Sequence, residues 1–388
     1  MKKTLIIIMF CIPLLIIQVQ AKDTSKSIIV MDMDTGRVLY EKNAHEKRLI
    51  ASTTKIMTAI LTIENTNIND SVVVGEEILK MYGTNIYIEV GEKIKVQDLL
   101  YGLILRSGND AATVLAKYTG TTEENFVNMM NLKAKQIGMI NTTFSNPHGL
   151  DDDTENYSTA YDMAVLSKYS NNSTIYKEIA KTKKYKTSTQ NKSYLWYNRN
   201  KLLTTYEYCT GGKNGYTPKA GRTLVTTASK QSMNLTIVTL NDPNEYKTHQ
   251  FLYEDIFSKY KNYTIIDKNK FEISKELYKG DSYIKESFIY PLTKEEKDNV
   301  QTEISMLKEK DITGKIGYIT IKLEEEVIGK IDIYKRNKKK EDNNIFERLK
   351  NYFSDIRKKF ILGLQKSLNP GPLVPIPLET YKSVSLIL

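Results

Sequence analysis

The sequence is poor in the residues that most often build metal sites and disulfide frameworks. Its 388 residues include three histidines and two cysteines, and none of the histidines belongs to an HExxH motif. This argues against a histidine-based metalloenzyme and against a disulfide scaffold. Hydrophobic residues make up 40% of the chain and charged residues 26%. That ordinary balance argues against a disordered, collagen-like or multi-span membrane protein.

More than half of the formal net charge of +10 lies in one segment near the end of the chain. Such an excess could serve nucleic acid, an anionic membrane or an anionic polymer. Residues 336–366 hold ten Lys or Arg and four Asp or Glu, a net charge of +6, and Lys2 and Lys3 supply two more positive charges. The rest of the chain is therefore close to neutral. This argues against nucleic-acid binding and predicts a single local basic surface.

The first 21 residues predict a secretory signal peptide. Lys2 and Lys3 precede an apolar run at 5–17, and Val19-Gln20-Ala21 ends in a small residue suited to cleavage. The run is shorter than the roughly 20 residues of a spanning helix, and an uncleaved anchor is the alternative. Cleavage after Ala21 leaves Cys209 alone, so we expect an exported protein without an internal disulfide. Cys209 is expected to be a structural thiol.

Hydrophobic patterns predict an α+β domain over residues 22–260. Short strands are expected at 28–31 and 38–40, and a strand pair at 223–228 and 235–240. Between them, helical periodicity starts at Ser52, recurs at 96–103 up to about Ser107, and continues at 110–117. Helices between strands that are distant in sequence are typical of this fold class.

The chain after residue 260 changes character. Residues 261–335 predict a small all-β domain, because residues alternate at 318–321 and 331–334 and turns are expected at 279–281 and 313–314. Residues 336–368 predict a basic amphipathic helix on a membrane surface, the alternative being a helix packed on the β domain. Its apolar residues recur at steps of three or four: Ile345, Leu349, Phe353, Ile356, Phe360 and Leu364. Residues 369–388, with four prolines, receive no assignment.

Three short motifs carry the functional signal through their order. Ser52-Thr53-Thr54-Lys55 opens a helix, Ser107-Gly108-Asn109 lies at a helix junction, and Lys213-Asn214-Gly215 follows, just before a strand. Each motif alone is weak, because Ser-x-x-Lys, Ser-x-Asn and Lys-x-Gly all recur elsewhere in the chain. In this order they form the motif set of penicillin-recognising serine enzymes.

The chemistry explains why these residue types belong together. No suitably placed histidine can activate a serine, whereas Lys55 lies one helical turn from Ser52 and can reach its Oγ. An unperturbed lysine titrates near 10.4, so burial and the like charge of Lys213 must lower its pKa. The amides of Ser52 and Tyr216 are the expected oxyanion donors, and Gly215 leaves room for a substrate backbone beside the strand. Ser107 and Asn109 are expected to relay a proton and hold the substrate amide.

A structural reading of each motif remains open. Ser52 could be only an N-cap with Lys55 solvated in the first turn. Ser107 could be a cap between helices, and 213–215 could be a hairpin turn. The joint occurrence of all three motifs, behind a signal peptide, favours the catalytic reading.

At these residues the sequence resembles the serine D-alanyl-D-alanine carboxypeptidases, the low-molecular-mass penicillin-binding proteins of the peptidase S11-like family. The matching stretches lie at 31–43, 51–59, 99–112, 146–151 and 213–221. The resemblance implies a penicillin-binding/β-lactamase-like transpeptidase fold, followed by the small β domain and the terminal helix. It also implies that Ser52 forms an acyl-enzyme with peptidoglycan stem pentapeptides, releases the terminal D-alanine, and is acylated by β-lactams. No metal or organic cofactor is implied, and the expected location is the outer face of the cytoplasmic membrane or the cell wall.

Three departures from the family pattern bear on substrate binding. Asn214 stands where threonine is usual, and Asn156 where histidine is common before the stretch at Ser158. No arginine lies at 240–250 to anchor the substrate carboxylate, so the cationic candidates are Lys213, Arg222 and Lys247.

Other functions remain possible on the same residues. A DD-endopeptidase would cut cross-linked peptides with the same groups. A class A β-lactamase needs a glutamate that activates the deacylating water, and residues 150–165 offer only Glu155. A catalytically weakened wall-binding protein is the non-enzymatic alternative, against which the intact Ser52, Lys55, Ser107 and Asn109 argue.

Overall fold

The structure is a computed structural model that describes residues 24–307, 314–336, 349–350 and 352–357. The predicted signal peptide (1–21), the tail (369–388) and most of the predicted helix 336–368 lie outside the described residues. The chain divides into two compact units. Unit 1 comprises 1–267, 287–301 and 321–329, and unit 2 comprises 268–286, 302–320 and 330–388. Within the described ranges, no helix combines the length and apolarity needed to cross a membrane.

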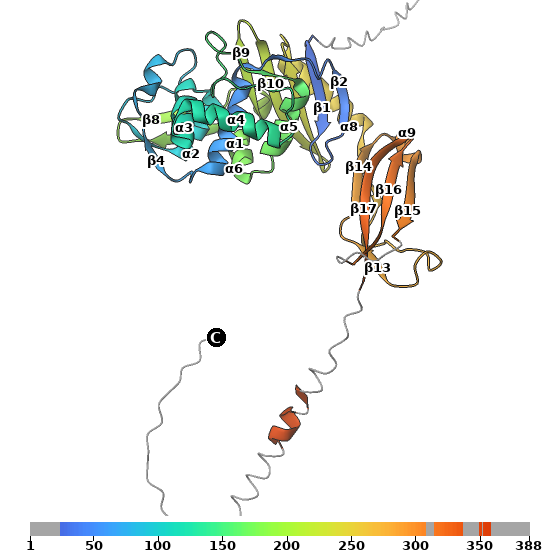
Figure 1. Ribbon diagram of the computed structural model, residues 1–388. Coiled ribbons are helices and arrows are strands. Elements are labelled where there is room, and N and C mark those ends of the chain that lie inside the picture. Colours follow the sequence, from blue (N-terminus) through green and yellow to red (C-terminus); the bar gives the residue numbers. More distant parts are fainter. Residues whose placement is uncertain (1–23, 308–313, 337–348, 351, 358–388) are drawn as a thin grey trace, which may run out of the picture. The chain divides into compact units, whose positions relative to one another are not determined.

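A five-stranded antiparallel sheet forms the centre of unit 1 (Figure 1). Its strand order is β2 (Val38–Lys42), β1 (Ser27–Asp32), β11 (Met233–Leu240), β10 (Gly221–Lys230), β9 (Cys209–Thr217). The predicted strand pair is confirmed, because Thr223 pairs with Leu240 and Ala228 with Leu235. The predicted strands at 28–31 and 38–40 lie in β1 and β2, which pair with each other. The N-terminal strands thus join the sheet beside strands that are about 200 residues away in sequence.

Both faces of the central strands β1, β10 and β11 are covered, which explains their nearly continuous buried residues. Along β1, Ile29 packs into one hydrophobic cluster with the helices, and Ile28 packs into a second cluster under α8 (Glu245–Lys259). In the same way Val238 belongs to the first cluster and Ile237 to the second. Alternate side chains of a strand point to opposite faces, so a sheet buried on both faces needs apolar or small residues at every position.

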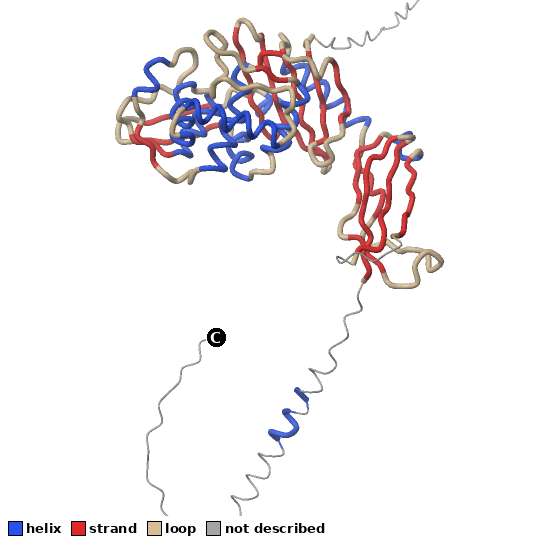
Figure 2. The backbone as a smooth tube through the Cα atoms, in the orientation of Figure 1, coloured by secondary structure: helices blue, strands red, loops and turns tan. Residues whose placement is uncertain are grey.

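The helical part of unit 1 covers the face opposite α8 (Figures 1 and 2). Its longer helices are α1 (Lys55–Asn65), α2 (Val96–Tyr101), α3 (Asn109–Gly120), α4 (Glu123–Gln136), α5 (Ala160–Ser170) and α6 (Thr174–Lys181). A π-helical turn η3 (Gly102–Arg106) extends α2, so the predicted helix at 96–103 does end at Ser107. The short segments are η1 (Ala51–Thr54), η2 (Glu76–Lys80), α7 (Leu202–Thr205) and the strand pairs β3 (Arg48–Leu49) with β6 (Tyr157–Ser158), β4 (Ser71–Val73) with β5 (Lys93–Lys95), and β7 (Lys184–Ser188) with β8 (Ser193–Tyr197).

The chain after α8 consists mainly of strands, as the alternating pattern indicates (Figure 2). β12 (Lys261–Ile266) pairs with β14 (Phe288–Leu292), which is followed by α9 (Lys294–Asp298). A four-stranded sheet has the order β13 (Ser282–Ile284), β17 (Glu326–Lys335), β16 (Lys315–Leu323), β15 (Val300–Met306). The segments expected at 318–321 and 331–334 are parts of β16 and β17. Residues 287–301 and 321–329 belong to unit 1, so the compact units do not follow the chain order strictly.

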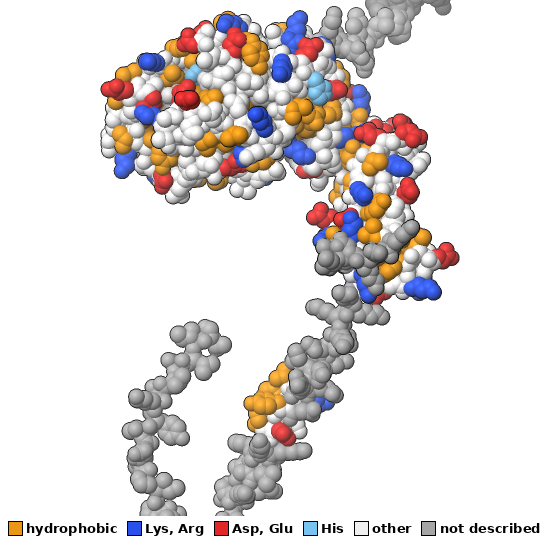
Figure 3. Space-filling view, viewed as in Figure 1, with side chains coloured by type: hydrophobic (Ala, Val, Ile, Leu, Met, Phe, Trp, Pro, Cys, Tyr) orange, Lys and Arg blue, Asp and Glu red, His pale blue; other side chains and the backbone are white. Residues whose placement is uncertain are grey.

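Two short pieces of the predicted amphipathic helix are described. Residues 349–350 and 352–357 are helical. Their large apolar side chains, Leu349, Tyr352, Phe353 and Ile356, are exposed. In Figure 3 the hydrophobic side chains of this segment gather on one side of it. The described part therefore presents an apolar surface without a covering partner among the described residues.

Arg37, in the turn between β1 and β2, attaches the segment 287–301 to the rest of unit 1. Its Nη2 lies 2.5 Å from Glu296 Oε1 and its Nη1 lies 3.0 Å from Glu296 Oε2, while Nη1 also donates to the Pro291 carbonyl. The guanidinium lies over the rings of Tyr260 and Tyr290. The Arg37 side chain is only 15% exposed, so both its charge and its donors depend on these partners.

Replacing Arg37 by alanine should therefore lower the free energy of unfolding by about 2–3 kcal/mol, because Glu296 and the Pro291 carbonyl would lose their donor in a partly buried site. Urea unfolding followed by tryptophan fluorescence and circular dichroism measures the loss. Lys259→Ala is the matched control, since the exposed Lys259–Asp255 pair should contribute at most about 0.5 kcal/mol. Equal losses in both variants would contradict the role given to Arg37.

Candidate active site

Ser52 and Lys55 lie at the start of the first long helix, where the prediction placed them. The helix begins with a 3₁₀ turn, η1, and becomes α-helical from Lys55. Thr54 stabilises this turn through a hydrogen bond from its Oγ1 to the Ala51 carbonyl. Because Lys55 follows Ser52 by three positions, about one turn, its Nζ can donate to Ser52 Oγ, over 3.0 Å. Ser52 is half-buried and Lys55 is fully buried, so the structure does not support a solvated first-turn lysine.

Lys55 is held in place by two acceptors besides the serine. Its Nζ donates to Asn109 Oδ1 over 2.8 Å and to the His148 carbonyl. Burial lowers the pKa of Lys55 to about 7, the Asp110 carboxylate opposes this decrease, and the nearby cation Arg199 adds to it. A substantial neutral fraction is therefore present near neutral pH, as a general base requires.

Ser107 and Asn109 reach the site from the junction between η3 and α3. Ser107 ends η3 in a left-handed conformation (φ 67°), which turns the chain sharply before α3 begins at Asn109. This turn directs Ser107 Oγ to Lys213 Nζ at 3.0 Å. Asn109 accepts from Lys55 and donates through Nδ2 to the Tyr82 carbonyl over 2.7 Å. In this arrangement Asn109 positions the base.

Lys213 extends to the site from the central sheet. The sequence suggested that 213–215 precedes a strand, but these residues lie within β9, so a hairpin turn is also wrong for them. The error arose because two of the three residues, Asn214 and Gly215, are typical of turns. Lys213 is buried and donates to the Asn214 carbonyl over 2.6 Å as well as to Ser107. Burial, followed by the charges of Lys55 and Arg199, lowers the pKa of Lys213 well below its usual range.

Gly215 brings the edge of the sheet against the serine. A Cβ at this position would lie 2.8 Å from the Ser52 backbone nitrogen and 2.5 Å from Thr223 Oγ1, closer than real contacts allow. Any side chain would therefore push β9 away from Ser52. β9 is the last strand in the order of this sheet, and the Tyr216 side chain that follows is exposed. The strand can therefore offer backbone groups to an extended peptide.

The loop at 146–151 helps to position Lys55, a role that the sequence did not predict. It presents the His148 carbonyl to Lys55 and is fixed by Asn146, whose Oδ1 accepts from the Gly149 amide over 2.6 Å. Gly149 has φ 84°, and a Cβ there would lie 2.0 Å from the Ala51 carbonyl oxygen. The loop thus packs directly on the turn that carries Ser52. The sequence marks this stretch only by its resemblance to the family, because the role of a backbone carbonyl leaves no signature in residue identity.

Asn156 connects the same loop to the catalytic helix. Its Nδ2 donates to Thr54 Oγ1 over 2.9 Å and to the Asn146 carbonyl over 3.0 Å. Its Oδ1 accepts from the amides of Ser145 and Asn146. Both the amide nitrogen and the amide oxygen of Asn156 therefore make hydrogen bonds that fix the loop.

Arg199 is a second residue that the sequence did not indicate. It follows β8, and its Nη1 donates to Thr84 Oγ1 over 3.0 Å. It is exposed, yet its charge contributes to the lowered pKa of both Lys55 and Lys213.

The other cations that the sequence proposed as carboxylate anchors are Arg222 and Lys247. Arg222 is exposed, lies over the Tyr216 ring, and has its Nη1 3.5 Å from Glu245 Oε1. Lys247 is exposed on α8.

The remaining candidates take no part in this cluster. Glu155 pairs with Lys219 and accepts from Tyr157, and the structure gives it no contact with Ser52 or Lys55. The Cys209 thiol is partly buried, and burial raises its pKa to about 11, so it stays protonated at neutral pH. Within the described ranges, no group of three His, Cys, Asp or Glu side chains is arranged to hold a metal ion.

Comparison with known proteins identifies the relatives of this arrangement. The chain is 34% identical to D-alanyl-D-alanine carboxypeptidase DacF of Bacillus subtilis over 280 residues, which cover 70% of this chain and 71% of the relative. It is 38% identical to DacC of Escherichia coli over 228 residues, or 56% of either chain. The structure of penicillin binding protein 5 from Haemophilus influenzae is similar, with a TM-score of 0.68 and 26% identity over 81% of this chain and 97% of that one. Residues 16–244 match the sequence profile of the D-alanyl-D-alanine carboxypeptidases, peptidase S11. The chain belongs to this family.

Proposed function

We propose that this chain is a serine-type D-alanyl-D-alanine carboxypeptidase that removes the terminal D-alanine from peptidoglycan stem pentapeptides. The observation that carries the proposal is the pair of lysine–serine contacts, Lys55 with Ser52 and Lys213 with Ser107, each at 3.0 Å in a buried cluster. Family membership gives the reaction class, a peptidase of the hydrolases. The penicillin-binding fold supports β-lactams as acylating inhibitors.

Acylation would begin at Ser52. Its Oγ attacks the carbonyl carbon of the penultimate D-alanine while neutral Lys55 accepts the hydroxyl proton. The negative charge that develops on the carbonyl oxygen would be stabilised by the Ser52 amide and by the amide of Tyr216. Tyr216 follows Gly215 on β9, and Gly215 packs so close to the Ser52 nitrogen that a Cβ would clash with it. When the C–N bond breaks, the leaving D-alanine amine must gain a proton. Ser107, bonded to Lys213, is suited to pass it on.

Deacylation requires water to attack the ester of Ser52. The same lysine can accept the proton of that water, which regenerates the serine and releases the shortened peptide. Glu155 is directed elsewhere, toward Lys219 and Tyr157, which argues against the β-lactamase alternative with a glutamate-activated water. Lys55 is thus proposed as the base of both half-reactions.

Substrate binding is proposed to follow the free edge of β9. The stem peptide would lie antiparallel or parallel to this strand, with backbone hydrogen bonds beside Gly215. Asn214 and Lys213 would face the terminal carboxylate. Arg199 adds a positive charge near both lysines, so it is proposed to attract this carboxylate to the site. The related DD-endopeptidase activity would use the same residues on a cross-linked peptide.

The place of action is a proposal from sequence and composition. Residues 1–21 would direct export, and residues 336–368 would attach the protein to the outer face of the cytoplasmic membrane. The net charge of +6 in 336–366 and the exposed Leu349, Tyr352, Phe353 and Ile356 support attachment to an anionic surface. Residues 22–260 would carry the activity, and the strands of 261–335 would connect it to the membrane.

Ser52→Ala should abolish covalent labelling by fluorescent penicillin and reduce kcat on a pentapeptide ending in D-Ala-D-Ala by roughly 10³-fold or more, because the nucleophile is lost. Ser173→Ala, a change of the helix-capping serine of α6, is the control and should keep its label. Persistent labelling of Ser52→Ala would contradict the proposal. Parallel incubation with a cross-linked dimer separates carboxypeptidase from endopeptidase by the product formed.

The value of kcat/KM should increase with pH through a pKa near 7. Lys55 acts as a base only after it loses its proton, and burial lowers its pKa to about 7. A pH–rate profile of the parent protein measures this pKa.

Arg199→Met removes a positive charge that disfavours protonated Lys55, so the pKa of Lys55 should increase and the acid limb of the pH–rate profile should move to higher pH. Arg199→Lys keeps the charge and should leave the limb near its original position. A limb that stays fixed in Arg199→Met would refute this electrostatic role.

Deletion of residues 341–388 should move the protein from the membrane fraction to the soluble fraction, with hydrolysis of a soluble peptide retained. A sharper variant, Phe353→Ser with Ile356→Ser, keeps every charge and should also weaken sedimentation with anionic vesicles, since the apolar face supplies part of the binding. If the truncated protein remains on membranes, the anchor lies in another segment, such as 1–21.

A further inference from the structure

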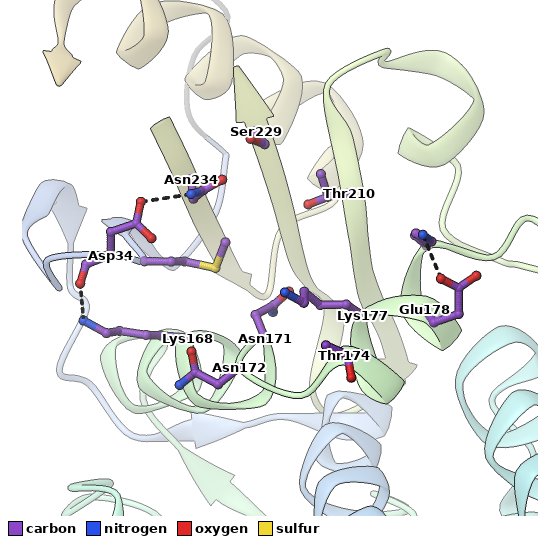
Figure 4. Close-up of a pocket in the computed structure, with 12 residues that line it drawn as sticks. Asp34, Lys168, Asn171, Asn172, Thr174, Lys177, Glu178, Thr210, Ser229 and Asn234 are labelled. Atoms are coloured by element: carbon purple, nitrogen blue, oxygen red, sulfur yellow. Dashed lines mark hydrogen bonds and ion pairs between the residues drawn. The ribbon is translucent and has the colours of Figure 1, made fainter. Parts of the chain in front are cut away.

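A cavity of about 600 Å³ lies in unit 1 apart from the catalytic cluster (Figure 4). Its walls are the turn after β1, the last turn of α5 with its connection to α6, the length of α6, and the ends of β9, β10 and β11. None of Ser52, Lys55, Ser107 and Lys213 lines it. Thr210 of β9 does, three residues before Lys213 and thus about 10 Å along the strand, on the side away from Gly215.

The polar lining of this cavity consists largely of short amide and hydroxyl side chains. They are Asn171, Asn172, Thr174, Thr210, Ser229 and Asn234. Each can both donate and accept hydrogen bonds. No aromatic ring is among the described residues that line the cavity. Such a surface suits a ligand with several hydroxyl groups, bound by hydrogen bonds and without ring stacking.

The charged groups of the cavity leave positive charge unneutralised. Lys181 Nζ pairs with Glu178 at 2.7 Å, and the Asp34 carboxylate accepts from Asn234 Nδ2 at 2.9 Å. Lys168 Nζ donates to the backbone carbonyl of Asp34 at 3.3 Å. Lys177 Nζ has no hydrogen bond or ion pair with any other described residue, and in Figure 4 its side chain extends from α6 toward Asn171. The five charged side chains sum to one net positive charge beside a dense set of hydrogen-bonding groups.

From these features we propose that the cavity binds a phosphate ester of a polyol or sugar, with Lys177 and Lys168 contacting the phosphate and the amide and hydroxyl groups contacting the hydroxyls. The volume lies in the range of pockets for small organic ligands and exceeds what an inorganic phosphate ion fills. The ester could be a free small molecule or one unit of an anionic polymer with repeating polyol phosphates. Both sources present the same phosphate and hydroxyl chemistry.

Isothermal titration of the purified full-length protein tests the site with three probes: sn-glycerol 3-phosphate, a short poly(glycerol phosphate), and inorganic phosphate. We expect saturable binding of at least one ester, with inorganic phosphate weaker. Lys177→Gln should raise its Kd about tenfold or more, because a hydrogen bond to a charged group is lost. Lys135→Gln, the same change at an exposed lysine of α4 that does not line the cavity, should leave the Kd unchanged.

The outcomes separate the two sources and the alternatives. Binding of glycerol 3-phosphate supports a free ester, and binding of the polymer alone supports a repeating polymer. Absence of saturable binding, equal effects of Lys177→Gln and Lys135→Gln, or equal affinity for inorganic phosphate would each overturn the proposal. Penicillin labelling of Ser52 should be the same in Lys177→Gln and the parent protein, so failure here is distinct from failure of the proposed peptidase activity.

Discussion

The burial of two lysines in one cluster is the constraint on which the rest of this site depends. An ammonium group removed from water needs acceptors, and the fold supplies them from separate segments. Lys55 has Ser52, Asn109 and the His148 carbonyl, and Lys213 has Ser107 and the Asn214 carbonyl. Because burial also lowers both pKa values, the environment that confines the lysines is the one that makes Lys55 a usable base.

The surrounding turns, loop and strand hold these acceptors in place around the two lysines. The left-handed turn at Ser107 places it opposite Lys213, and Asn109 follows at the start of α3. Gly149 and Gly215 allow a loop and a strand to approach the turn of Ser52 more closely than any side chain would permit. Asn156 then connects the loop to Thr54. Backbone geometry at these positions therefore holds the segments that carry the catalytic groups close together.

Electrostatics also connects the site with the features found outside it. Arg199 acts on Lys55 and Lys213 by charge alone, while its own hydrogen bond is to Thr84. The cavity beside α6 and the predicted basic helix at 336–368 each add positive charge, although residues 22–335 are nearly neutral in sum. In the proposed function, Arg199 would attract the substrate carboxylate, and the other two positive regions would bind anionic groups outside the active site.

The sequence by itself determined the four catalytic candidates, the strand pair formed by 223–228 and 235–240, and the predominance of strands in 261–335, although the short helix α9 also lies there. Those features depend on local periodicity and on residue types whose chemistry is specific. It could not determine the roles of the His148 carbonyl and of Arg199, nor that Lys213 lies within a strand. A carbonyl has no residue identity, a charge acts through space, and Asn214-Gly215 favours turns until a neighbouring strand supplies its hydrogen bonds. Only the tertiary structure decided these points: the loop at 146–151 brings the His148 carbonyl to Lys55, the charge of Arg199 acts on both lysines, and β9 pairs with β10.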